Sequence, residues 1–296
     1  MDNNSDESDM KINGMTEKEF YKKYKLEFDN EFRTTCPLKW EDFVQIYNDY
    51  IKHRHIFFKI EEFLHMEFQN AIRDGLISAH SIKSRTKDAE HLTAKLIRKK
   101  YDLYMADEYK KYHNETDNNY VLPHHDERYR NVDITNYTSV ITDIVGIRVL
   151  LTYEEECKKV DTHIQGKYHA LDMVKYSPIN GEQGDGFAQL DIPMVKKNYR
   201  SIHYTIIIQS EQIPSVQESI QMPNHYSNLN HPYFAAEIQV RTIFQEGWCE
   251  VDHDNLYPYL LKNETLKIFS ETFSKMAHLA DEMANAFKEL KKVQDK

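Results

Sequence analysis

The most constraining feature of the sequence is the segment 235–253, AAEIQVRTIFQEGWCEVDH, in which the hydrophobic period changes halfway. In its first half apolar residues alternate with Glu237, Gln239 and Arg241, which predicts a strand with one apolar and one charged face. In its second half apolar residues recur at three-to-four spacing, which predicts a helix. Burying charged and amide side chains is costly, so the charged face must line a wet or ligand-filled site.

A second segment, 142–151 (TDIVGIRVLL), has the same character, with Asp143 at its start and Arg148 inside a predicted core strand. Two acids on adjacent strands would form a site for a hard cation, and the arginines around them would bind phosphates. Spacing alone also allows Asp143 and Glu237 to be surface or helix-capping carboxylates. The cation site is favoured because each acid adjoins an apolar strand that also carries an arginine.

A basic cluster follows a strand expected over residues 76–83. Arg85 and Lys87 lie two positions apart where this strand gives way to a helix, so an extended backbone directs both side chains the same way. Lys95 and Arg98 continue the basic face into the helix, which Asp88 can cap. Phosphates are the natural ligand of such a face, and a solvated helix surface is the alternative.

The predicted loop at residues 196–203 (KKNYRSIH) combines the cation Lys197, the aromatic Tyr199 and the imidazole of His203. Tyr199 could stack on a nucleobase, or it could pack on the sheet from a surface loop. His203 and His253 are more often satisfied structural histidines than catalysts, and no histidine cluster has the spacing of a zinc site.

Helices are expected at both ends of the chain. Residues 40–73 read as a long amphipathic helix, and residues 260–290 carry an apolar stripe that is expected to pack on it. With mixed strands between them, the fold class is α+β. The expected segments are a disordered N-terminus over 1–15, a helical region over 16–75, a central domain over 76–258 with an inserted loop over 113–137, and a C-terminal helix over 259–296.

The bulk composition excludes several functional classes. The 296 residues carry a formal net charge of −10, which argues against broad nonspecific binding of nucleic acid or membranes. No apolar run is long enough for a membrane span, and the polar, acidic start is not a signal peptide. The three cysteines are widely spaced, as in a reduced protein of the cytoplasm.

Four blocks of sequence resemble, in the same order, the synthetase domain of the RelA/SpoT family. They are residues 84–87 (SRTK), 143–148 (DIVGIR), 198–203 (NYRSIH) and 237–253 (EIQVRT, then the tryptophan and the final histidine). The resemblance covers about residues 78–257 and is specific because all four blocks occur together. It implies a nucleotidyltransferase-like mixed sheet flanked by helices, in a stand-alone small alarmone synthetase without a hydrolase domain.

The resemblance also implies an activity. Family members transfer pyrophosphate from ATP to the ribose 3′-hydroxyl of GDP or GTP, with Mg²⁺, and release AMP. By position, Asp143 would hold Mg²⁺, and Glu237 would hold it too or accept the hydroxyl proton. The ATP-binding residues would be Arg85, Lys87, Lys95, Arg98 and Arg148. The acceptor-binding residues would be Lys197, Tyr199, His203, Gln239, Arg241 and His253.

The sequence departs from the family pattern near the acceptor. The glycine that precedes the loop tyrosine is absent, and the ending at residues 253–258 (HDNLYP) lacks two cations of the family. A changed acceptor is therefore an alternative: a toxic relative that modifies the 3′ CCA end of tRNA or an adenosine nucleotide. A second alternative is an inactive module that senses nucleotides or binds a partner. A homo-oligomer and an antitoxin protein are open as partners.

Overall fold

The computed structural model describes residues 10–26, 32, 35–113, 122, 125–177, 190–196, 200–209, 212–213, 233–255 and 264–294. The chain divides into two compact units. The first comprises Met1–Ile56 and Lys87–Ile141, and the second comprises Phe57–Thr86 and Thr142–Lys296. None of the helices in the described residues combines the length and the apolar character that a bilayer crossing requires.

The first unit is helical. Its elements are α1 (Glu17–Lys23), the first part of α3 (Trp40–Arg73), α4 (Ala89–Tyr112), the 3₁₀ helix η1 (Glu127–Tyr129) and α5 (Tyr137–Val140). The predicted cap of α4 is confirmed, since the Asp88 side chain accepts hydrogen bonds from the amides of Glu90 and His91. Glu90 in turn accepts hydrogen bonds from Lys23 and Tyr24, both at 2.6 Å, which bind the C-terminal end of α1 to α4.

Two segments expected to be irregular are partly structured. Residues 10–15 contain a tight turn closed by two backbone hydrogen bonds between Ile12 and Met15, and Ile12 is fully buried. Within the described part of 113–137, the buried Lys100 ammonium donates to the carbonyl of Arg130 at 2.7 Å. The Asn13 side chain also donates to Glu90 of α4 at 2.7 Å. Each segment therefore makes a specific polar contact to α4, and contacts of this kind leave no periodic signal in the sequence.

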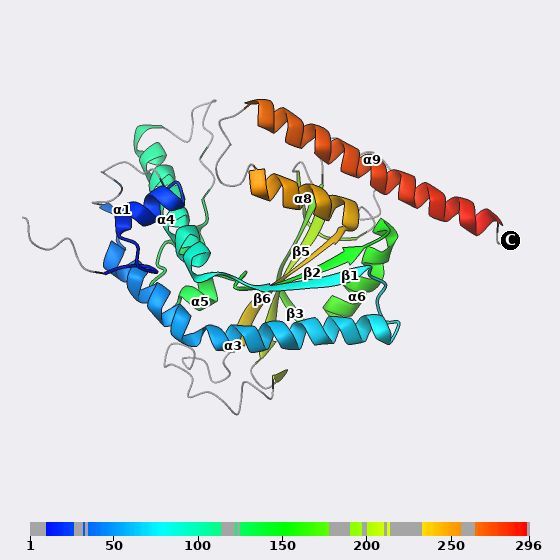
Figure 1. Cartoon of the computed structure of the whole chain (residues 1–296), viewed down its shortest axis with the longest axis horizontal. Coiled ribbons are helices and arrows are strands. Elements are labelled where there is room, and N and C mark those ends of the chain that lie inside the picture. Colours follow the sequence, from blue (N-terminus) through cyan, green and yellow to red (C-terminus); the bar gives the residue numbers. More distant parts are fainter. Residues whose placement is uncertain are drawn as a thin grey trace, which may run out of the picture. The chain divides into compact units, whose positions relative to one another are not determined.

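The second unit is built on a six-stranded mixed sheet with the order β1-β2-β6-β5-β3-β4 (Figure 1). Its strands are β1 (Ser81–Thr86), β2 (Val145–Leu151), β3 (His169–Ser177), β4 (Met194–Lys196), β5 (Ser201–Gln209) and β6 (Tyr233–Thr242). The pairs β2–β6 and β3–β4 are parallel and the other three are antiparallel. The predicted α+β class with a mixed sheet is confirmed. The first strand is displaced from the expected 76–83, so Arg85 lies within it.

One face of the sheet is apolar and is covered by the second part of α3 and by α6 (Cys157–Lys167), which follows the 3₁₀ helix η2 (Glu154–Glu156) (Figure 1). The hydroxyl groups of Ser84 and Thr86 on β1 donate to Glu61 of α3 at 2.8 and 2.6 Å. Tyr204 of β5 donates to Asp161 of α6 at 2.8 Å. Since side chains alternate along each strand, residues one position away point to the opposite face.

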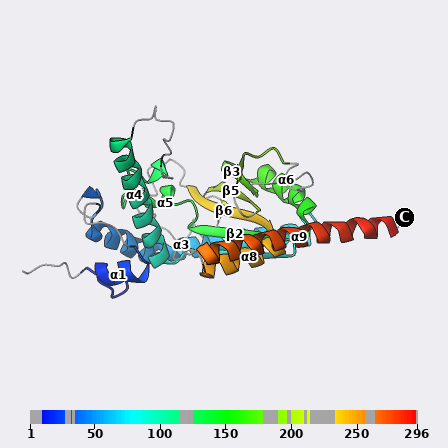
Figure 2. The same cartoon turned by 90° about the horizontal axis from the view of Figure 1, so that it is seen from above.

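The opposite face carries α8 (Ile243–Asn255), which continues directly from β6, and α9 (Glu264–Gln294) runs along α8 in both views (Figures 1 and 2). Trp248 of α8 donates its indole N–H to the carbonyl of Ser270 of α9 at 2.9 Å. The expected burial of the α9 stripe against the N-terminal helix is wrong. Phe269, Met276 and Phe287 are 66%, 62% and 68% exposed, because α9 packs through its opposite, small and polar side.

Candidate active site

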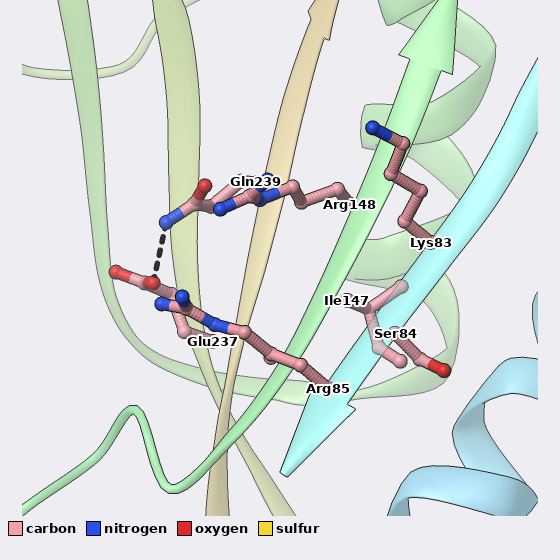
Figure 3. Close-up of a pocket in the computed structure, with 8 residues that line it drawn as sticks. Lys83, Ser84, Arg85, Ile147, Arg148, Glu237 and Gln239 are labelled. Carbon is pink, nitrogen blue, oxygen red and sulfur yellow. Dashed lines mark hydrogen bonds between the residues drawn. The ribbon is translucent and has the colours of Figure 1, made fainter. Parts of the chain in front are cut away.

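The charged face of the sheet assembles most of the predicted site in two rows. Arg85 of β1 pairs with Gly146 of β2, which pairs with Glu237 of β6. Two residues away along each strand, Lys83 pairs with Arg148, which pairs with Gln239. Paired residues of neighbouring strands point to the same face, and these side chains line a cavity of about 110 Å³. Figure 3 shows Arg85 and Arg148 extending across it towards Glu237 and Gln239.

Gly146 leaves the space that Arg85 occupies. A Cβ atom at this position would lie 3.6 Å from both Cγ and Nε of Arg85, which is ordinary van der Waals contact. A larger side chain would enter the volume of the guanidinium group. The glycine of the segment 143–148 therefore allows a cation from β1 to lie across β2, opposite the carboxylate of Glu237 on β6.

Glu237 is the carboxylate at the centre of the site. Its Oε1 lies 3.2 Å from Nδ1 of His203, and its Oε2 accepts a hydrogen bond from Gln239 at 2.6 Å. Burial favours the neutral acid, but the contacts with His203 and Gln239 outweigh burial and lower the pKa of Glu237 below its ordinary value. Glu237 is therefore an anion at neutral pH.

Asp143 lies in the turn immediately before β2 and is half-buried. It stands two residues before Val145, which pairs with Ala236 of β6, the neighbour of Glu237, and its charge raises the pKa of the Glu237 carboxyl. The structure thus brings together two carboxylates that lie 94 positions apart in the sequence, as positions 143 and 237 show. Two adjacent anions next to a cationic row form an electrostatic arrangement suited to a cation bound together with phosphates.

A third carboxylate, Glu246 of α8, neutralises the cations on the other side of the cavity. It is buried and lies 2.9 Å from Nζ of Lys83, 3.0 Å from Nη1 of Arg148 and 3.5 Å from Nη1 of Arg241. Burial raises its pKa, but the hydrogen bond from Lys83 and the two arginines have the larger combined effect, and the pKa of Glu246 is lowered. Arg148 also contacts Glu250, so α8 is held to the sheet by charge.

The remaining predicted residues fall into three groups. Arg241 is buried under α8, where it donates to Gln239 as well as pairing with Glu246. Lys87, Lys95 and Arg98 belong to the first unit, at the start of α4 and within it. Lys197 and Tyr199 lie outside the described residues, as does the side chain of His253, whose backbone belongs to α8.

Sequence reasoning missed a buried polar network at the end of the predicted acceptor loop. Arg200, which directly follows Tyr199, is 2% exposed and donates to Glu154 at 2.7 Å. Its amide donates to Oε1 of Gln245 at 3.3 Å, and Nε2 of Gln245 donates to Asp281 of α9 at 2.9 Å. Arg200 belongs to the segment 198–203, which resembles the family. Nothing in the sequence identifies its partners, because they come from three distant segments.

Lys83 and Glu246 were also missed. Of the two, Lys83 could have been found from the alternation of its strand. Lys83 lies two residues before Arg85, so strand alternation places it on the same face. Glu246 lies on a helix, and its contacts depend on how α8 packs on the sheet, which its sequence does not specify.

The donor set fits one class of metal ion. Within the described ranges, no group of three or more His, Cys, Asp or Glu side chains is placed to hold a metal. Mg²⁺ commonly takes only one or two protein carboxylates and completes its shell with water and phosphate oxygens. Asp143 and Glu237 meet that requirement, whereas a protein zinc site would need more donors.

Comparisons with known proteins identify the family of the chain. Residues 84–262 match the region found in RelA / SpoT proteins. No curated protein matches the sequence significantly.

Among solved structures, small alarmone synthetase 1 from Bacillus subtilis is 15% identical with a TM-score of 0.53, over 84% of this chain and 100% of that chain. The same synthetase bound to AMPCPP is 14% identical with a TM-score of 0.50, over the same shares of the two chains. A protein from Streptococcus mutans is 16% identical with a TM-score of 0.51, over 81% and 96% of the two chains. These structures show a shared fold. Because the family match spans more than half of the chain and includes both acids, the chain belongs to the RelA/SpoT family and is a pyrophosphokinase-like enzyme.

Proposed function

We propose that this protein transfers pyrophosphate from ATP to the ribose 3′-hydroxyl of GDP or GTP, with Mg²⁺, and releases AMP. The observation that carries the proposal is the position of Glu237 near Asp143, facing Arg85 across one cavity of the sheet. Phosphoryl-type transfer requires little covalent chemistry from the protein, so positioning and electrostatic stabilisation are the main contributions of such a site.

Each group has a role that its surroundings support. Asp143 and Glu237 would hold Mg²⁺, which when bound neutralises and orients the phosphates. Glu237 is also able to accept a hydrogen bond from the acceptor hydroxyl, because its pKa is low and it is anionic at neutral pH. Arg85 extends into the cavity and would bind phosphate oxygens.

The cations behind Arg85 are already compensated. Arg148 and Lys83 both contact Glu246, so their net attraction for a phosphate is smaller than that of an uncompensated cation. We therefore assign them chiefly to fixing the wall of the cavity, with Arg148 able to pack on the base of ATP. The donor is proposed to be ATP because the Bacillus synthetase of similar fold is bound to AMPCPP, an ATP analogue.

One observation favours an acceptor other than GDP or GTP. Residues 253–258 (HDNLYP) lack the two cations found at the end of the family block, which weakens the case for a guanosine 5′-polyphosphate. The alternative acceptors are the 3′ CCA end of tRNA and an adenosine nucleotide. An inactive sensing module is disfavoured because both carboxylates are present, at the same end of the β2–β6 pair.

The test is a transfer assay with ATP labelled in its β- and γ-phosphates and with GDP, GTP, ATP or deacylated tRNA as acceptor. Label in GDP or GTP supports the proposal, and label only in tRNA or an adenosine nucleotide contradicts the acceptor. We expect Asp143→Asn and Glu237→Gln each to lower kcat by about 10²–10³-fold or more, by analogy with loss of a transition-state contact. The control is Glu62→Gln on the exposed side of α3, which should keep full activity. Unchanged circular dichroism and Tm in both site variants would separate lost chemistry from lost fold.

A further inference from the structure

A second cavity lies within the helical first unit, and none of the described residues that line it belongs to the predicted active site. Its volume is about 280 Å³, which is larger than that of the cavity beside Glu237. Its walls are one face of α4, residues 32 and 35–37 of the segment between α1 and α3, and Arg130 after η1. A single water molecule needs only about 10–15 Å³ of such space, so this cavity is large enough for a small organic molecule.

A buried lysine lines this cavity. Leu96, Lys100 and Leu103 follow one another at three-to-four spacing along α4, so Lys100 stands in the apolar face of the helix. Lys100 is only 5% exposed. Its Nζ donates to the carbonyl of Arg130 at 2.7 Å, and it forms no ion pair with a carboxylate of the described residues. A buried ammonium without a paired anion is unfavourable, so Lys100 is a strong attractor for an anion that enters the cavity.

The other charges that line the cavity compensate one another. Asp107 accepts two hydrogen bonds from Arg130, at 2.7 and 3.0 Å, and Glu108 pairs with Lys111. These pairs are on the exposed side of the cavity, since the side chains of Arg130, Asp107 and Lys111 are 39%, 41% and 63% exposed. The charge that is left is the single positive charge of Lys100. One carboxylate neutralises it, whereas a phosphate monoester carries nearly two negative charges at neutral pH.

The rest of the lining is largely apolar or aromatic. Phe32 and Leu103 are buried, and Pro37 and Tyr104 complete this part of the wall. The ring centroids of Phe32 and Tyr104 lie 5.5 Å apart. Pockets with apolar and aromatic walls and one charged group bind the apolar body of a ligand and orient its polar end.

We propose that this cavity binds a small monocarboxylate with an apolar or aromatic body, whose carboxylate pairs with Lys100. An ammonium has three N–H donors, and the described residues supply one acceptor, the carbonyl of Arg130. The carboxylate of the ligand accepts from the remaining donors, and hydrogen bonds between two charged groups are the strong ones in a buried site. The body of the ligand lies against Leu103 and the rings of Phe32 and Tyr104.

Cys36 provides the readout for the test, because it lines the same cavity and is 6% exposed. The full-length chain is alkylated with iodoacetamide, and each cysteine is followed by mass spectrometry of its peptide. The probes are 3-phenylpropanoate and octanoate, compared with 3-phenylpropanamide and phenyl phosphate. Each carboxylate should slow alkylation of Cys36 about tenfold at about ten times its Kd, because only the unoccupied fraction reacts. Alkylation of Cys249 in α8, which does not line the cavity, should be unchanged.

Substitutions of Lys100 test its role. Lys100→Met removes the charge, and Lys100→Gln removes it but keeps an N–H donor for the carbonyl of Arg130. Both should abolish the protection of Cys36 by carboxylates, and without a probe their Tm should not fall below that of the wild type, because no paired cation is lost. The matched control is Lys99→Met, whose lysine pairs with Asp102 on the same helix, and it should retain the protection.

Four results would each overturn the proposal. The first is alkylation of Cys36 that neither carboxylate slows, and the second is equal slowing of Cys36 and Cys249, which would show a general effect on the chain. The third is a marked fall in Tm in both Lys100 variants, which would make Lys100 a structural cation paired within the chain. The fourth is protection by 3-phenylpropanamide or phenyl phosphate that equals or exceeds the protection by 3-phenylpropanoate.

Discussion

Gly146 shows how a single missing side chain positions a cation. Replacement by alanine adds a Cβ atom at ordinary contact distance from Arg85, 3.6 Å, so we expect Gly146→Ala to fold and to keep most of its activity. Gly146→Val adds two further methyl groups in the volume of the guanidinium and should raise the KM for ATP at least about tenfold, the scale of one lost charged hydrogen bond. Steady-state kinetics with varied ATP measure this change.

The matched control for this prediction is Gly166→Val in α6, where a Cβ atom would have no neighbour within 4 Å. It should leave the KM for ATP unchanged and should not destabilise α6, because valine has a higher helix propensity than glycine. If Gly146→Val kept a normal KM for ATP, Arg85 would have no role in binding the donor.

Asp281 should make the stability of the protein depend on pH. Burial raises its pKa from 3.8 to about 6, and the nearby carboxylate of Glu154 adds to the shift while Arg200 opposes it. A raised folded-state pKa means that the folded chain binds more protons than the unfolded chain between about pH 4 and pH 6. The contribution of Asp281 to the free energy of unfolding therefore falls as pH rises through that window, by on the order of 2–3 kcal/mol.

The prediction is tested with Asp281→Asn, which keeps an oxygen to accept the hydrogen bond from Gln245. The difference in unfolding free energy between variant and wild type should grow from pH 4 to pH 6 in favour of the variant and stay constant above. Urea titrations at several pH values measure it. Asp172→Asn, at an exposed position of β3, should show no such growth; a flat difference for Asp281→Asn as well would contradict the prediction.

At the residue scale the sequence predicted which side chains share a face but not which of them are already paired. Alternation along 235–242 placed Glu237, Gln239 and Arg241 together because the period of a strand is set by backbone geometry alone. The burial of Arg241 beneath Glu246 could not be predicted, since it depends on the angle at which α8 leaves β6. The roles of Lys197 and Tyr199 stay predictions.

At the scale of elements, α8 should be held to the sheet by a buried charge cluster. Glu246 and Arg241 are both about 5% exposed in their side chains, and Glu246 also contacts Arg148. Glu246→Gln leaves the buried arginine charge uncompensated, so we expect the free energy of unfolding to fall by on the order of 3 kcal/mol. Urea denaturation at neutral pH measures the loss.

Glu250 provides the control for this prediction, because it contacts the same Arg148 but is 50% exposed. Glu250→Gln should cost no more than about 1 kcal/mol, as is usual for exposed ion pairs. Equal losses in the two variants would show that burial of the cluster does not determine its strength.

The bounds of helices were easier to predict than the elements against which the helices pack. The bounds of α3 agree with the predicted helix over 40–73 because its apolar period is long and uninterrupted. The stripe of α9 was also identified correctly as a pattern. Its burial within the chain was a wrong inference, since amphipathicity shows that a helix has an apolar face but not whether that face is covered by the same chain.

At the scale of the whole molecule, the sequence predicted the α+β class and not the strand order. The order β1-β2-β6-β5-β3-β4 places β2 beside β6, although they are separated in the chain by three other strands. Pairing over such a distance depends on tertiary packing, and no local pattern encodes it. The family resemblance supplied the mixed sheet, and the paired carboxylates follow from the parallel register of β2 and β6.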